Sequence, residues 1–170
     1  MRELYVRPTL RHHDDGGLIA HHKNLVASIH WKPPSLEQAH ALVALTEELV
    51  AEHGRFGSAV LVTGERLIGT PDPQTREVLI QLIRDTKETG LGTAFVIMAG
   101  GFFTGAAVAL LSGLFTVART REPSQAFREL GPAATWLDGH LRTHTVTWED
   151  GEVATFLDQA MLLRAHESSA

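Results

Sequence analysis

The feature that most constrains this chain is a run of 28 residues without a charged side chain, at positions 91–118. About 20 apolar residues are enough to cross a bilayer as a helix. Gly101 and Gly105 also form the Gly-x-x-x-Gly spacing that lets membrane helices approach closely. Two interpretations are therefore open, a membrane-spanning helix or a buried strand followed by a buried helix.

The composition within the run favours the strand and helix. Residues 95–98, Phe-Val-Ile-Met, form a short apolar segment of the kind found in strands covered on both faces. Gly100 and Gly101 favour a break after it, and the glycines of the run lower the hydropathy of any membrane span. We therefore expect a strand over 93–98, a helix over 102–118 and no membrane span.

The N-terminal part of the chain predicts a hairpin. Residues 3–11 and 18–32 have strand composition and flank the turn sequence Asp14-Asp15-Gly16-Gly17. Residues 25–31, Leu-Val-Ala-Ser-Ile-His-Trp, are the strongest strand in this part. A second turn at Lys23 and Asn24 is the alternative to one long strand over 18–32.

Helix start and stop signals follow in the next part. Ser35 and Gln38 fit a capping box ahead of a helix over 36–53, which Gly54 would end. Residues 58–63 read as a buried strand. Asp72 and Pro73 predict the start of a helix over 73–89 that Gly90 would cap.

The C-terminal part contains a short strand that ends at residue 127, a helix over 131–142 and a tail helix over 152–166. This tail helix places five apolar residues on one face: Val153, Phe156, Leu157, Ala160 and Met161. Alternation of strands and helices predicts an α/β fold, with a mixed, mostly parallel sheet and helices packed on it. We expect one domain over 1–142, made of the hairpin 1–24 and the core 25–142, and an extension over 143–170.

Three segments carry a resemblance to a known family. The first segment is residues 25–31 with the helix entry 35–39, and the second is residues 59–64, Ala-Val-Leu-Val-Thr-Gly. The third is Phe-Arg-Glu-Leu at 127–130 followed by Ala-Ala-Thr-Trp-Leu at 133–137. In their order and spacing, these segments resemble the STAS domain of sporulation anti-sigma-factor antagonists. The resemblance covers residues 25–137. It implies a non-catalytic, regulatory protein-binding module whose partner is a kinase-like anti-sigma factor or a second copy of the chain.

The chain differs from the STAS family at the position where regulated antagonists are phosphorylated. Phosphorylated antagonists carry Asp-Ser-Ser/Thr-Gly where this chain has Thr-Pro-Asp-Pro-Gln-Thr at 70–75, so no phosphosite is carried over. We expect partner binding through the loop and helix start near 64–76, by Thr70, Asp72, Gln74, Thr75 and Arg76, with the 102–118 helix beside them. Asp72 would place a fixed negative charge at a helix N-terminus; alternatively it only caps the helix.

Composition excludes several other functions. Lys and Arg number 15 against 20 Asp and Glu, a net charge of −5, which is unsuited to a nucleic-acid backbone. The absence of cysteine excludes disulfides, thiol nucleophiles and cysteine-ligated zinc. The first residues lack the apolar segment of a secretory signal, so we expect a cytoplasmic protein.

Ten histidines make a metal site the weaker alternative. In a hairpin, His12 would face Ile19 and His21 would lie diagonally on the same face, while His140 and His144 have the i, i+4 spacing of helical metal ligands. A partly protonated polar surface explains the same residues. No nucleophile, base and orienting group fall together, so we expect neither an enzyme nor a cofactor.

The apolar side chains of the 102–118 helix support a further alternative. They exceed what one helix face usually buries: Phe102, Phe103, Leu110, Leu111, Leu114 and Phe115. They could form a dimer surface or the groove of a small apolar ligand or lipid carrier, or they could be covered by the tail helix.

Overall fold

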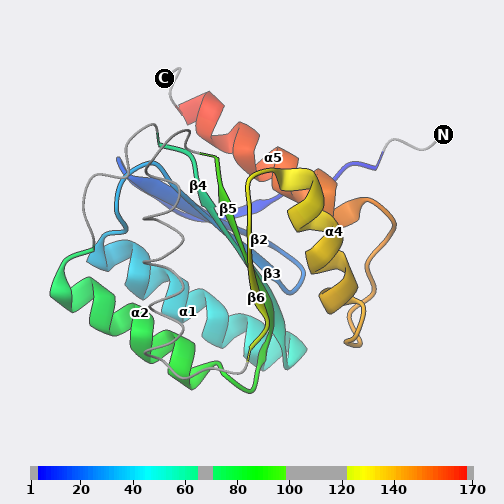
Figure 1. The fold of residues 1–170 in the computed structure, drawn as a ribbon, viewed down its shortest axis with the longest axis horizontal. Helices are drawn as coiled ribbons and strands as arrows, with labels where there is room; N and C mark the ends of the chain where they lie inside the picture. Colours follow the sequence, from blue (N-terminus) through cyan, green and yellow to red (C-terminus); the bar gives the residue numbers. More distant parts are fainter. Residues whose placement is uncertain (1–3, 65–70, 99–121, 168–170) are drawn as a thin grey trace.

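The protein forms a three-layer arrangement in which one sheet lies between two pairs of helices (Figure 1). The computed structural model describes residues 4–64, 71–98 and 122–167. Its elements are, in chain order, β1 (Thr9–His13), β2 (Gly17–His22), β3 (Leu25–His30), α1 (Leu36–His53), β4 (Phe56–Val62), α2 (Pro73–Asp85), β5 (Gly90–Ile97), β6 (Ser124–Phe127), α4 (Leu130–Leu141) and α5 (Glu152–Glu167).

The sheet is mixed and mostly parallel. Its strand order is β1-β2-β3-β4-β5-β6, with antiparallel pairing from β1 to β3 and parallel pairing from β3 to β6. The helices α1 and α2 lie on one side, and α4 and α5 lie on the other (Figure 1). The expectation of an α/β fold with a mixed, mostly parallel sheet is therefore confirmed.

The N-terminal strands differ from the prediction in two places. Lys23 adopts a left-handed φ of 49°, so the segment 18–32 divides at Lys23 and Asn24 into β2 and β3. The alternative of a second turn is thus the correct one. The first strand begins at Thr9 rather than at residue 3, after Pro8, which has no amide N–H to donate to a sheet ladder.

The helix α1 matches its predicted bounds at both ends. The Ser35 hydroxyl accepts a hydrogen bond from the Gln38 amide at 3.1 Å, and the Gln38 side chain accepts one from the Ser35 amide at 3.3 Å. Gly54 has a φ of 81°, and its amide donates to the Val50 carbonyl at 2.8 Å. Both caps are local contacts, which is why sequence spacing located them.

The helix α2 ends four residues before the predicted end, and Gly90 is not its cap. Thr86 is the C-cap, and its hydroxyl donates to the Leu82 carbonyl at 2.8 Å. Gly90 instead begins β5, where a side chain would overlap the Glu122 carboxylate. Glycine here allows the close approach of the Glu122 carboxylate and does not end the helix.

The main core lies between the sheet and the helices α4 and α5. It includes the tail-helix face predicted from the sequence, of which Val153, Phe156, Leu157 and Ala160 are buried and Met161 is partly buried. A smaller cluster joins α1 to the other face of the sheet through Leu45 and Leu49. Because α5 contacts β2 and β3, the last helix completes a core begun by the first strands.

A buried carboxylate joins α5 to the turn between β2 and β3. Glu152 has a side chain only 7% exposed, and its oxygens accept from the Lys23 ammonium at 2.7 and 2.8 Å and from His22 Nε2 at 2.8 Å. The Glu149 amide donates to the same carboxylate at 2.7 Å. The Lys23 ammonium also lies 5.1 Å from the centre of the Trp148 ring. These contacts fix the start of α5 against the sheet.

The described part of the uncharged run is a buried strand. Residues 90–97 form β5, and all of them are buried. The predicted helix over 102–118 lies outside the described residues. Among the residues described, no helix has the length and apolar character that crossing a bilayer requires.

Candidate functional site

The carboxyl ends of the parallel strands β3, β4 and β5 meet at one edge of the sheet. The starts of α1 and α2 follow β3 and β4 in the chain and therefore lie at this edge. The turn between β1 and β2 lies there too, since Gly17 is paired with His30 at the end of β3. We call this region the carboxyl edge. In open α/β sheets it is the usual location of binding sites.

The predicted docking residues lie at the start of α2. Asp72 caps this helix, because its carboxylate accepts from the Thr75 hydroxyl at 2.6 Å and from the Thr75 amide at 3.0 Å. These hydrogen bonds lower the pKa of Asp72 below its usual value. The carboxylate is exposed to solvent and remains ionised at neutral pH.

The other predicted docking residues divide into accessible and inaccessible positions. Gln74 and Arg76 are exposed on the first turn of α2, beside Asp72. Thr75 is fully buried, and its hydroxyl belongs to the helix cap. Thr70 lies outside the described residues, as does most of the loop before α2. The described surface of this site therefore consists of Asp72, Gln74 and Arg76.

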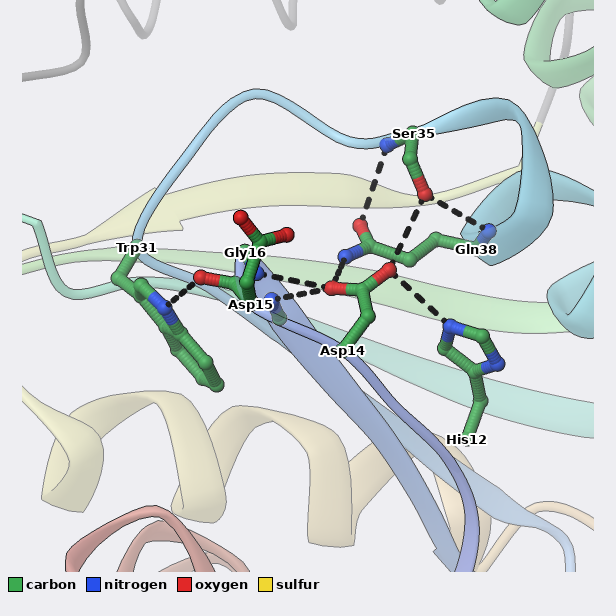
Figure 2. Close-up of polar contacts among 8 residues, drawn as sticks. His12, Asp14, Asp15, Gly16, Trp31, Ser35 and Gln38 are labelled. Carbon is green, nitrogen blue, oxygen red and sulfur yellow. Dashed lines mark hydrogen bonds and ion pairs between the residues drawn. The ribbon is translucent and has the colours of Figure 1, made fainter. Parts of the chain in front are cut away.

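A second polar cluster, which the sequence analysis did not single out, surrounds Asp14 in the turn between β1 and β2 (Figure 2). Asp14 Oδ1 accepts from the amides of Gly16 at 2.8 Å and Gly17 at 3.0 Å. The same oxygen accepts from Gln38 Nε2, on the first turn of α1, at 2.5 Å. Asp14 therefore orders its own turn and attaches it to α1.

The second oxygen of the carboxylate contacts two more side chains. Asp14 Oδ2 accepts from the Ser35 hydroxyl at 3.2 Å and lies 3.2 Å from His12 Nε2 (Figure 2). Burial raises the pKa of Asp14, but the hydrogen bonds from Gly16, His12, Gln38 and Ser35 outweigh it and lower the pKa to about 2. At neutral pH this carboxylate is ionised and saturated with donors.

The cluster contains the residue types of a catalytic triad in an arrangement that cannot activate a nucleophile. In a triad, histidine lies between serine and the carboxylate and takes the serine proton. Here Asp14 lies between Ser35 and His12, and both are hydrogen-bonded to it. The Asp14 cluster is therefore a structural connection between the hairpin and α1.

Close backbone packing supports this connection. A side chain at Gly17 would lie 2.7 Å from the Ile29 carbonyl oxygen and 2.9 Å from Gln38 Nε2. His30 is buried beside it, and burial lowers the pKa of its imidazole to about 4. His30 is therefore neutral at pH 7, and the cluster carries the negative charge of Asp14.

The C-terminal half of α5 also reaches the carboxyl edge. The Arg164 guanidinium donates to the Thr63 hydroxyl, just after β4, and lies 4.9 Å from the centre of the Trp31 ring, just after β3. The Trp31 indole N–H donates to the Asp15 carbonyl at 2.7 Å. The ends of two parallel strands, the hairpin turn and α5 are thus joined at one place.

The structure places the four candidate metal ligands in separate environments. His12 is paired with Ile19, as expected, but its ring contacts Asp14. His21 is partly buried, and this burial lowers the pKa of its imidazole. The His140 ring packs 4.2 Å from the Trp136 ring centre, and His144 Nε2 lies 2.8 Å from the His53 carbonyl. Within the described ranges, no three His, Cys, Asp or Glu side chains are grouped to hold a metal ion.

No family model, curated protein or solved structure matches the chain. The class that the fold itself defines is an α/β protein with a mixed six-stranded sheet. The STAS resemblance stays a hypothesis. The apolar carrier alternative depends on residues 102–118, which lie outside the described part of the chain.

Proposed function

We propose that this protein is a non-catalytic, regulatory protein-binding module of the STAS-like type, which docks a partner protein through the start of α2. The observation that supports the proposal is the exposed trio Asp72, Gln74 and Arg76 on a helix start held by the buried Thr75. Such a surface offers a fixed carboxylate beside two exposed polar side chains, on a backbone ordered by the helix cap.

The charges of this surface suit recognition of another protein. Asp72 carries a negative charge whose position is fixed by two hydrogen bonds from Thr75. Arg76 presents a positive charge one helical turn later. Adjacent opposite charges select for a partner with the complementary arrangement and reject partners with like charges in register. Partner choice would therefore depend on both residues together.

The STAS resemblance suggests which partners to expect. A kinase-like anti-sigma factor is the first candidate, and a second copy of this chain is the other. We place this interaction in the cytoplasm. The proposal includes no phosphorylation, because the family's Ser/Thr motif is absent and the nearby Thr75 hydroxyl is buried in the cap.

The proposal can be tested by site-specific photo-crosslinking. A photoreactive amino acid at Gln74 is expected to capture a protein partner in lysate of the source organism, whereas the same group at Gln125, on β6, captures a different set or nothing. Asp72→Ser retains a cap oxygen and removes the charge. Combined with Arg76→Glu, it is expected to abolish capture from Gln74.

Mass spectrometry identifies the crosslinked protein, and circular dichroism verifies that each variant is folded. Capture of the same proteins from both positions would contradict docking at α2. Capture from Gln74 that survives the charge changes would also contradict the proposal, since it assigns recognition to these charges.

A further inference from the structure

The large apolar side chains that are exposed in the described residues gather at one groove. They are Tyr5, Leu10 and Leu162, which are 78%, 41% and 49% exposed. All three line the same groove, of about 550 Å³, together with Leu163. Scattered apolar residues on a surface need no explanation, but a contiguous group of them indicates an interaction site.

The groove lies at the outer edge of the sheet. One wall is the N-terminal segment that leads into β1, and the other is the C-terminal half of α5. Of the described strands, β1 pairs with β2 alone, and no described strand occupies its second edge. An open strand edge offers backbone donors and acceptors to an added strand, and pockets beside it select the side chains of that strand.

The fixed charge among the residues that line the groove is positive. Arg7 is exposed on the wall formed by the N-terminal segment, and His166 lies on the wall formed by α5. None of the described residues that line the groove is acidic. The whole chain has a net charge of −5, so the positive charge of Arg7 gives this groove the opposite sign to the protein that carries it.

We propose that this groove binds an acidic segment of another protein in extended conformation. The segment lies along β1, inserts an apolar side chain between Tyr5 and Leu162, and places carboxylates near Arg7 and His166. Charge complementarity selects an acidic partner, and the open edge selects an extended one. This site is separate from the start of α2 and adds a second docking surface to the one proposed above.

Charge also argues against a second copy of the chain as the occupant. The strand edge that a second copy would present, residues 7–13, contains Arg7 and Arg11 and no acidic side chain, so it offers no carboxylate to Arg7. Like charges that face each other across paired strands are destabilising. Because Arg11 is already paired with Glu48 at 2.6 Å, the charge available to an occupant is that of Arg7, which has no ion-pair partner among the described residues.

Selection from a random dodecapeptide library tests the proposal. Peptides that bind the Leu162→Arg variant are first removed from the library, because they recognise other parts of the protein. The remaining peptides are then selected for binding to the wild-type protein. We expect the recovered peptides to combine Asp or Glu with aliphatic or aromatic residues. A fluorescein-labelled recovered peptide is then titrated by anisotropy against wild type and variants.

The expected result is a Kd about tenfold weaker for Arg7→Glu and for Leu162→Ser, with binding that weakens as salt rises. Arg128→Glu, which makes the same charge change at an exposed position beyond β6, leaves the Kd unchanged. Asp72→Ser also leaves it unchanged, so this proposal and docking at α2 fail or succeed independently.

Three results would overturn the proposal. Recovery of no peptide, or of neutral and basic peptides, excludes an acidic segment. A Kd that Arg7→Glu leaves unchanged places the binding elsewhere on the protein. Self-association in sedimentation velocity that Leu162→Ser abolishes assigns the groove to a second copy. Circular dichroism of both exposed-site variants verifies that they are folded.

Discussion

Replacement of Glu152 by glutamine removes the charge at the centre of the contact between α5 and the sheet while it keeps the side-chain shape. Loss of one partner of a dry ion pair costs about 3–5 kcal/mol, because the remaining charge stays buried. Lys23 and His22 retain 31% and 24% of their side-chain exposure, against 7% for Glu152, so water recovers part of this cost. We therefore expect Glu152→Gln to lower the free energy of unfolding by about 2–3 kcal/mol.

The dependence on pH provides a second readout of the same variant. Burial raises the pKa of Glu152, but contacts with Lys23, the Glu149 amide and His22 outweigh it, and the pKa is lowered from 4.5. A lowered folded-state pKa gives stability that is present above the unfolded-state value and is lost as the pH falls through the folded-state value. Wild-type stability should therefore fall below about pH 4.5, and this contribution should be absent in Glu152→Gln.

Guanidinium denaturation followed by far-ultraviolet circular dichroism measures both effects. Tryptophan fluorescence is less suitable, because the Trp148 ring lies beside Lys23 and would report the local change. Glu149→Gln is the matched control: its side chain is exposed, and it contacts Glu152 through its backbone amide and carbonyl, so we expect a change within about 0.5 kcal/mol. This account of the contact would be refuted if Glu152→Gln and wild type had the same free energy of unfolding. It would also be refuted if both lost the same amount of stability between pH 5 and pH 3.

Three further predictions concern the carboxyl edge. The pKa of Asp14, lowered to about 2 from 3.8, should stabilise the fold by about 2 kcal/mol at neutral pH, and Asp14→Ala should lose this amount in guanidinium denaturation. That contribution is present above pH 3.8 and lost as the pH falls towards 2. Gly17→Ala should cost about 1–3 kcal/mol, measured in the same way, because its side chain would contact the Ile29 carbonyl. Asp72→Ala should lower the thermal midpoint because the cap on Thr75 is lost, whereas Asp72→Ser should preserve it.

Matched variants separate these effects from general damage. Asp15→Ala is the control for Asp14→Ala, since the Asp15 side chain is exposed and pairs with Lys32 at the surface, and its backbone contact with Trp31 survives the substitution. Gly131→Ala is the control for Gly17→Ala, because its side chain would meet nothing. If Asp14→Ala and Asp15→Ala have equal effects, the cluster does not stabilise the fold. Full stability of Gly17→Ala would contradict the close packing at that position.

Local sequence signals were sufficient for the elements whose ends depend on neighbouring residues. The capping box of Ser35 and Gln38 gave α1 its bounds, and Asp72 with Pro73 gave the start of α2. The end of α2 was predicted wrongly because Gly90 reads as a helix stop. Gly90 instead begins β5, where the Glu122 carboxylate approaches it from 32 positions later in the chain, and single-sequence spacing carries no information on that approach.

The candidate site was predictable only in part for the same reason. The sequence identified the turn at Asp14, but the attachment of its carboxylate to Gln38 depends on how the hairpin packs on α1. The metal hypothesis grouped His12 and His21 by strand alternation. Each ring instead has its own surroundings, because the register of β1 shifts between Leu10 and His12 and the turn draws His12 to Asp14. Side-chain partners across elements are fixed by packing, which a pattern within one element does not describe.

The contact of α5 with β2 and β3 has a consequence for the order of synthesis. Between the end of β3 at His30 and the start of α5 at Glu152, the ribosome adds about 120 residues, which takes roughly 6–24 s at typical rates. Throughout that interval the strand faces that Phe156 and Leu157 later cover remain uncovered. The nascent chain therefore exposes an unfinished apolar surface until its last helix emerges, and its folding in the cell should depend on chaperones that shield it.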